Sequence, residues 1–286
     1  MVTVSHCHVG SVGFGSKNDP EVGTIPGLSR ILEKCGVERA VVFAPFPEVG
    51  LGWGGRAAEL FNDPNEWLLE EIRHYPNLFG FATINPREPD AAERLRSLAM
   101  RGLVGAKVHP AVHGITINDP SIDGYFKVAE DLRLPIHMHT GVHGGFLRSY
   151  LPTLIDDVAQ RHPELPIILD HVGGYALFHE ALAVLHNPGN VNCYVGLTQC
   201  SGRDPLYQLT PERVDVLLRT VGAGRIVYGL DYPWNEDNPD ALKCDLAWVR
   251  SWQITDQEKN DILGGNIERL IGQGVRARAN TIPTSG

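Results

Sequence analysis

The sequence lacks the features that would place the protein in a membrane, in an export route or on a nucleic acid. No apolar stretch reaches the length of about 18 residues that a membrane-spanning helix needs. The opening residues, MVTVSHCHVG, contain no basic segment followed by an apolar one, so they do not resemble an export signal. The formal net charge is −9 and lysine and arginine form no run, which argues against a polyanionic partner. We therefore expect a cytoplasmic protein that binds neither membrane nor nucleic acid.

Cysteine is also scarce, and its spacing excludes two common uses. The five cysteines are an odd number and form no C-x-x-C pair, which argues against a disulfide framework and against a zinc knuckle. Histidine, by contrast, occurs 12 times among the 286 residues and gathers at a few places. The chain length suits one α/β barrel of about 250 residues with additional loops.

Short apolar segments rich in β-branched residues recur along the chain and predict strands that are buried on both faces. They are VTVSH (2–6), AVVFAPF (40–46), LFGFATI (78–84), LVGAKVH (103–109), PIHMHT (135–140), PIILDH (166–171), NVNCYVG (190–196) and RIVYGLD (225–231). Longer amphipathic segments, several of which begin at Asp or Pro, alternate with these strands and predict helices. They cover residues 65–75, 91–100, 122–132, 150–162, 175–185, 210–221, 238–250 and 255–272.

This alternation predicts a single (β/α)8 barrel, in which eight parallel strands close on themselves. The structural alternative is a doubly wound open sheet, which would normally carry a G-x-G-x-x-G turn after its first strand. Residues 10–16, GSVGFGS, match that turn only loosely. We expect the barrel to span residues 1–272 and residues 273–286 to form a flexible tail.

Metal-binding residue types fall at the predicted ends of four strands. His6 and His8 are two positions apart and should point together into the barrel, with Cys7 facing the helices. His139, His171 and Asp231 end the fifth, sixth and eighth strands. Barrel enzymes build their active sites at this C-terminal face, so the positions predict a metal site at the mouth.

The same residues belong to longer motifs that resemble the amidohydrolase superfamily. These motifs are H-x-H (6–8), KVHP (107–110), HTG (139–141), HVGG (171–174), GLDYP (229–233) and ILGGNIERL (262–270). The resemblance is to the amidohydrolase-related branch that also contains aminocarboxymuconate-semialdehyde decarboxylase, and it covers nearly the whole chain.

The resemblance implies that His6, His8, His139 and Asp231 bind one divalent metal ion. It also implies that His171 orients the activated water or the substrate, so Asp231 and His171 are the expected catalytic residues. Zinc suits these ligands, and manganese, iron and cobalt remain open. The family commonly has Asp two residues before the first histidine, where this chain has Val4. Polar support for the ligands is therefore either absent or supplied from elsewhere.

Five further residues are candidates for substrate binding. Trp53 and Arg56 lie in the long glycine-rich loop after the second strand, and Arg148 and Arg203 follow the fifth and seventh strands. Lys107, on the fourth strand, could bind a substrate carboxylate, or could be carboxylated and bridge two metal ions as in some relatives.

The remaining histidines have other predicted environments. We expect His137 to be buried and hydrogen-bonded one layer below His139, and we place His109 and His113 in a loop. We expect four histidines to lie on helix surfaces: His74, His162, His179 and His186.

The ligand set predicts an enzyme, and two reactions compete. In a hydrolase, the metal ion lowers the pKa of water, Asp231 takes up the proton of that water, and His171 stabilises the oxyanion. The bond cleaved would be an amide, lactone or ester in a small molecule. In a non-oxidative decarboxylase acting on an unsaturated or aromatic acid, His171 or Asp231 would instead deliver a proton to carbon. We favour hydrolysis, with a non-catalytic binding barrel as the third alternative, and we leave a homodimer open.

Overall fold

The computed structural model describes residues 1–13, 19–46, 62–202, 204–234 and 238–279, and in them the predicted barrel is present. The eight parallel strands pair in chain order and close between the first and the last. They are β1 (Thr3–His8), β2 (Arg39–Phe43), β3 (Leu78–Ala82), β4 (Gly105–Val108), β5 (Ile136–His139), β6 (Ile167–Asp170), β7 (Cys193–Thr198) and β8 (Ile226–Tyr232). The (β/α)8 prediction is confirmed.

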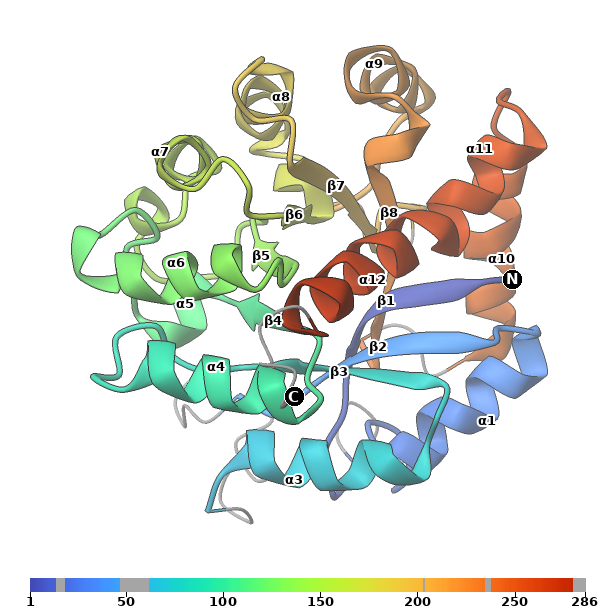
Figure 1. Ribbon diagram of the computed structural model, residues 1–286. Coiled ribbons are helices and arrows are strands. Elements are labelled where there is room, and N and C mark those ends of the chain that lie inside the picture. The colour runs from blue at the N-terminus through green and yellow to red at the C-terminus, as the bar shows by residue number, and fades with distance from the viewer. Residues whose placement is uncertain (14–18, 47–61, 203, 235–237, 280–286) are drawn as a thin grey trace.

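Most helices surround the strands as an outer ring, and α12 lies across one end of the barrel (Figure 1). They are α1 (Ile25–Cys35), α3 (Pro64–Glu71), α4 (Ala91–Arg101), α5 (Pro110–His113), α6 (Asp123–Asp131), α7 (Thr153–Arg161), α8 (Phe178–His186), α9 (Pro211–Val221), α10 (Pro239–Arg250), α11 (Asp256–Asn260) and α12 (Asn266–Ala279). Short 3-10 turns cover Ile72–His74, Pro120–Ile122, Leu147–Ser149, His171–Gly173 and Ala223–Arg225, and a π-helical turn covers Asp261–Gly265. No helix of the described ranges is long and apolar enough to cross a membrane.

Helices α1 and α12 differ from the expectation. Helix α1 was not predicted, although its start carries a clear signal: the Thr24 side chain accepts a hydrogen bond from the Gly27 backbone at 3.1 Å, and proline occupies the first turn. Helix α12 continues to Ala279, so residues 273–279 are helical rather than part of a tail. The remaining predicted tail, 280–286, lies outside the described residues.

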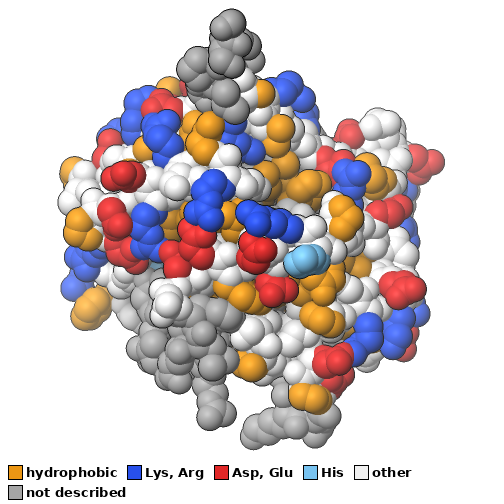
Figure 2. All heavy atoms as spheres, turned by 60° about the horizontal axis from the view of Figure 1, so that its bottom comes forward, with side chains coloured by type: hydrophobic (Ala, Val, Ile, Leu, Met, Phe, Trp, Pro, Cys, Tyr) orange, Lys and Arg blue, Asp and Glu red, His pale blue; other side chains and the backbone are white. Residues whose placement is uncertain are grey.

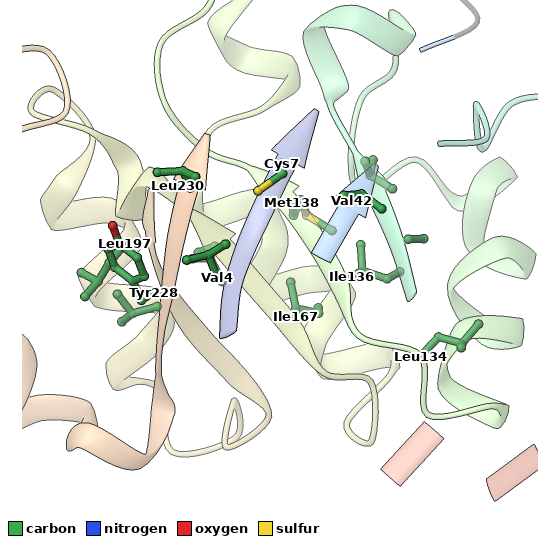
Figure 3. Packing of buried hydrophobic residues seen from close by; sticks show 14 of the residues in the cluster. Val4, Cys7, Val42, Leu134, Ile136, Met138, Ile167, Leu197, Tyr228 and Leu230 are labelled. Carbon is green, nitrogen blue, oxygen red and sulfur yellow. The ribbon is translucent and has the colours of Figure 1, made fainter. Parts of the chain in front are cut away.

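The strands separate two apolar layers because successive side chains alternate between their faces. Outward-facing residues pack against the helices, among them Val4 and Cys7 on β1 and Ile136 and Met138 on β5 (Figure 3). Inward-facing residues such as Phe43, Phe81 and Ile168 fill the barrel. Helix α12 closes the end at which the strands begin, since its Ile267 and Leu270 join this inner cluster. Helix α12 does not cover the opposite end of the barrel, where the strands finish, so a functional site is expected there.

Charged side chains of both signs are interspersed on the face shown in Figure 2, with apolar side chains between them. On this face the negative net charge of the chain is not gathered into one acidic field, so the surface gives no long-range steering of one sign there.

Candidate active site

The predicted ligand residues meet at the C-terminal mouth of the barrel. His6 and His8 end β1, His139 ends β5, His171 follows β6, and Asp231 lies near the end of β8. The side chain of His8 is 14% exposed, whereas His6, His139, His171 and Asp231 are buried. The strand-end prediction therefore places these residues correctly.

Four residues at the mouth adopt left-handed backbone conformations that are unusual for residues with a side chain. The φ angles are 69° at His6, 60° at His171, 59° at Gln199 and 62° at Asp231. Such conformations cost of the order of 1–3 kcal/mol each and persist where the surrounding structure imposes them. Because a left-handed residue breaks the regular alternation of a strand, it changes which way the side chains around it point. Gln199, whose amide nitrogen lies 3.3 Å from the Trp234 carbonyl oxygen, was not predicted as part of the mouth.

Three of the predicted ligand atoms lie as close together as the ligands of one metal ion. His6 Nε2 is 3.0 Å from Asp231 Oδ1 and 3.2 Å from His8 Nε2, and His8 Nε2 is 3.5 Å from Asp231 Oδ1. A tetrahedral zinc site with bonds of about 2.1 Å separates its ligand atoms by about 3.4 Å. The donor set and its spacing therefore fit a divalent cation.

His171 lies beside this group of ligand atoms. His6, His171 and Asp231 each offer a ligand atom within 4.8 Å of the others. The Nδ1 atom of His171 lies 3.0 Å from the carbonyl oxygen of Thr198, which can only accept, so Nδ1 carries the proton. The Nε2 atom is thus the one with a lone pair. Burial lowers the pKa of His171 to about 4, which keeps the ring neutral.

His139 is near this group without belonging to it. Its ring centroid lies 4.8 Å from that of His171, and its Nε2 atom lies 2.9 Å from the Gly141 carbonyl oxygen. The ring also stacks on His109 at 3.9 Å with an interplanar angle of 10°. Coordination through Nε2 would require the contact with Gly141 to break, so the predicted ligand role of His139 remains a prediction.

The charges of the site are set by burial and by the carboxylates. Burial would raise the pKa of Asp231, but His6, His8 and His171 hold it well below the usual range. Burial lowers the pKa of His8 to about 4. At His6, burial acts in the same direction, but the carboxylates of Asp170 and Asp231 outweigh it and raise the pKa. The site therefore pairs an ionised Asp231 with the neutral imidazoles of His8 and His171, whereas His6 keeps its proton to a higher pH.

Asp170 is a buried residue of the site that the sequence analysis missed. It is fully buried at the end of β6, and its Oδ1 atom lies 2.6 Å from His137 Nδ1 and 3.2 Å from His6 Nδ1. Its Oδ2 atom accepts a hydrogen bond from the Lys107 ammonium group. Lys107 is itself fully buried, and its ammonium group is bound to Asp170. Its predicted contact with substrate remains a prediction. His137 is buried and hydrogen-bonded, as expected.

The other substrate-binding candidates are not assembled at the mouth in the described part of the chain. Arg148 is exposed on a 3-10 turn, with its guanidinium 4.3 Å from the centroid of the Phe146 ring. Trp53, Arg56 and Arg203 lie outside the described residues.

Two histidine assignments change. His113 ends the short helix α5 instead of lying in a loop, whereas His109 immediately precedes that helix. Both are buried, and His109 packs against the ring of His143 at 4.5 Å. The surface assignment of His162 is wrong: it is 3% exposed, with Nε2 3.0 Å from Asp123 Oδ1. A histidine at the end of a helix can point inward when an acidic residue on a neighbouring helix faces it. Sequence spacing does not reveal such a contact. His74, His179 and His186 are exposed, as expected.

Comparison with known proteins agrees with the fold. The family model described as amidohydrolase matches residues 38–273, and the chain belongs to this family. The structure of 5-carboxyvanillate decarboxylase from Sphingomonas paucimobilis is similar, with a TM-score of 0.68, 16% identity, and coverage of 95% of this chain and 98% of that one.

Two further solved structures show the same fold. A dihydroxybenzoic acid decarboxylase from a Polaromonas species, which contains manganese and the inhibitor 2-nitroresorcinol, has a TM-score of 0.67 at 17% identity and covers 95% of this chain and 96% of that one. A candidate 2-pyrone-4,6-dicarboxylic acid hydrolase from Pseudomonas putida has a TM-score of 0.66 at 17% identity, with coverage of 95% and 97%. At these identities the likeness concerns the fold, and the reaction is not transferred from it.

Proposed function

We propose that this amidohydrolase-family enzyme is a metal-dependent hydrolase that cleaves an amide, lactone or ester bond in a small molecule. One divalent cation, with zinc as the first choice, is held by His6, His8, His139 and Asp231. The position of the Asp231 carboxylate carries the proposal. Within the described ranges its ion-pair partners are the imidazoles of His6 and His8 rather than a lysine or arginine. The carboxylate is therefore available both as a ligand and as a base.

A divalent cation bound by imidazoles and a carboxylate supplies hydroxide at neutral pH, because it lowers the pKa of water from about 15.7 toward 7. The residues of the chain handle the protons. Asp231, ionised and nine-tenths buried, accepts the proton of the attacking water and returns it to the leaving group. Asp231 thus plays the part of general base and then general acid.

His171 acts on the attacking water. Because its Nδ1 proton is engaged with Thr198, its Nε2 atom, which has the lone pair, is the one that faces the group of His6 and Asp231. In this position Nε2 accepts a hydrogen bond from the attacking water and orients it, while Asp231 takes up a proton of that water.

The protonation of the mouth favours hydrolysis over decarboxylation. Decarboxylation ends with proton delivery to carbon, which needs a group that is protonated beforehand. Burial lowers the pKa of His171 to about 4, and burial together with His171 holds the pKa of His139 well below its usual value. The pKa of Asp231 is also well below its usual range. At neutral pH these groups are unprotonated, so none of them holds a proton to deliver to carbon.

Decarboxylation of an aromatic or unsaturated acid is the second candidate. The observation that favours it is the likeness of the fold to 5-carboxyvanillate and dihydroxybenzoic acid decarboxylases, one of them with manganese. In this chain the same ligand group would gather the oxygens of the substrate, and His171 would need to be protonated on substrate binding.

The two candidates differ in their products. Protein loaded with zinc, and separately with manganese, is incubated with panels of lactones, esters, amides and hydroxybenzoic acids in water labelled with oxygen-18. Metal-stripped protein is the control. We expect acid release from a lactone, ester or amide, with labelled oxygen in the new carboxylate and no CO₂. Release of CO₂ from an aromatic acid, without hydrolysis of the other panels, would establish the decarboxylase instead.

A further inference from the structure

Asp170 connects three strands at a point directly below the proposed metal ligands. Its partners are Lys107 on β4, His137 on β5 and His6 on β1, and its side chain is completely buried. A buried carboxylate without compensation would cost several kcal/mol, so this arrangement persists because each of its oxygens has a polar partner.

We propose that Asp170 is a positioning residue that fixes the ring of His6 and directs its Nε2 lone pair at the metal site. This inference rests on the proposed function, since it assumes that His6 is a metal ligand. An ionised carboxylate only accepts hydrogen bonds, so the contact of 3.2 Å requires the proton of His6 to be on Nδ1. When a cation is bound, the opposite atom, Nε2, is the one that would give up its proton and offer a lone pair, and it lies 3.0 Å from the ligand atom Oδ1 of Asp231.

Lys107 also contributes to the positioning of His6, through its contact with Asp170. Its ammonium group on Oδ2 keeps Asp170 ionised and leaves Oδ1 for the two imidazoles. Thr198 adds a further contact, with Oγ1 at 3.3 Å from His6 Nδ1. The His6 ring is thus held from below by groups on two other strands, Asp170 on β6 and Thr198 on β7.

This network also answers a question raised by the sequence. Position 4, where the family commonly has Asp, carries Val4, which is fully buried in the apolar layer between strands and helices. Val4 cannot support His6. Asp170 supplies the missing carboxylate from β6, through the arrangement of carboxylate, histidine and metal ion that orients ligands in many metal sites.

The same atoms do not form a second cation site. His6, His137 and Asp170 do offer three ligand atoms within 4.8 Å of one another. However, the Lys107 ammonium group already lies on Asp170 and supplies the positive charge that a cation would bring. A second cation would have to displace a buried lysine from its only carboxylate partner among the described residues.

The test compares two variants that both lack Lys107 and differ only in the carboxylate of Asp170. Lys107→Met/Asp170→Asn removes both members of the ion pair with little change in size, and Lys107→Met alone retains the carboxylate. Zinc affinity is measured by competition with a chromophoric chelator. We expect the second substitution to weaken zinc binding about 10–100-fold relative to Lys107→Met. Asp156→Asn, which alters a half-buried carboxylate on α7 that accepts hydrogen bonds from Asn187 and Asn190, is the matched control and should leave zinc affinity unchanged.

A spectroscopic measurement separates positioning from a merely structural role. Nitrogen-15 spectra of the metal-free protein at alkaline pH, with the His6 signals assigned from a His6→Gln variant, report which ring nitrogen carries the proton. We expect the Nδ1–H form in the wild type and a mixture of the two forms once Asp170→Asn is present. An unchanged tautomer and unchanged zinc affinity in the double variant would overturn the positioning role. If the wild type failed to bind zinc, the proposed function would fall, and the tautomer alone would decide the role of Asp170.

Discussion

The Nε2 atom of His6 lies 3.0 Å from Oδ1 of Asp231, although the two residues belong to the first and the last strand of the barrel. They meet because β1 pairs with β8 when the barrel closes. Both residues adopt left-handed backbone conformations, so the site depends on local geometry as well as on closure. The predictions below follow from this contact and its surroundings.

Metal content is the first prediction. The ligand atoms of His6, His8 and Asp231 are spaced for one cation, and the ion pair of Lys107 with Asp170 occupies the neighbouring group of His6, His137 and Asp170. We therefore expect close to one tightly bound divalent ion per chain, measured by elemental analysis after dialysis against zinc and then against buffer. Two ions per chain, with mass spectrometry showing a carboxylated Lys107, would refute the mononuclear site.

The second prediction concerns His139→Ala. As the proposed fourth ligand, His139 should be required for tight binding, so its loss should sharply lower zinc content while the barrel remains folded. His143→Ala, in the loop that follows, is the matched control and should retain the metal. If His139→Ala bound zinc normally, the contact with Gly141 would be the resting role of this ring. His171, which is grouped with His6 and Asp231, would then be the fourth ligand.

The third prediction is a loss of stability in mild acid. Burial lowers the pKa of His113 to about 3 and that of His171 to about 4. In the unfolded chain both titrate near 6.5, so between that pH and the folded-state values the unfolded state binds more protons. The stabilisation is complete above about pH 6.5 and declines as the pH falls toward 4.

Replacing one of these histidines should reduce the pH dependence. From pH 7 to pH 5, a fully buried neutral histidine contributes about 2 kcal/mol to the loss of unfolding free energy. We expect His113→Gln to lose less stability than the wild type over this interval by about that amount, measured by denaturant unfolding of metal-free protein. His179→Gln, at an exposed position, should behave like the wild type. Equal slopes for all three proteins would contradict a buried, neutral His113.

The positions of the strands could be predicted because buried parallel strands are short, apolar and rich in β-branched residues. The mouth residues could be placed for the same reason, since the first, fifth, sixth and eighth predicted strands end at or beside one of them. Helix α1 was missed because it follows a glycine-rich segment that gave no periodic signal, although Thr24 caps it.

Asp170 was missed because regular alternation misleads at His171. Adjacent residues on a strand face opposite sides, so Asp170 and His171 should not both point into the barrel. They do so because His171 has a φ of 60°, which ends the regular strand after Asp170. A useful signal was present, since Asp170 stands two residues after Ile168, which lies in the inner cluster. Tertiary contacts of this kind, like that of His162 with Asp123, depend on partners from distant segments.

The central claim is that Asp231 acts both as a metal ligand and as the proton acceptor, and Asp231→Asn separates the two duties. Asparagine has nearly the same size and keeps an oxygen that can coordinate, but an amide cannot take up the proton of the attacking water. The measurement is kcat of the variant with the best hydrolysed substrate of the panel, at increasing zinc, together with its zinc content.

The account predicts that Asp231→Asn retains much of its zinc but loses about 10²–10⁴ in kcat, the range for a lost general base. The loss should persist at saturating zinc. If added zinc restored the rate, Asp231 would be a ligand only and another group would carry the proton. If the variant were as active as the wild type without added zinc, the assignment of Asp231 to the site would be wrong.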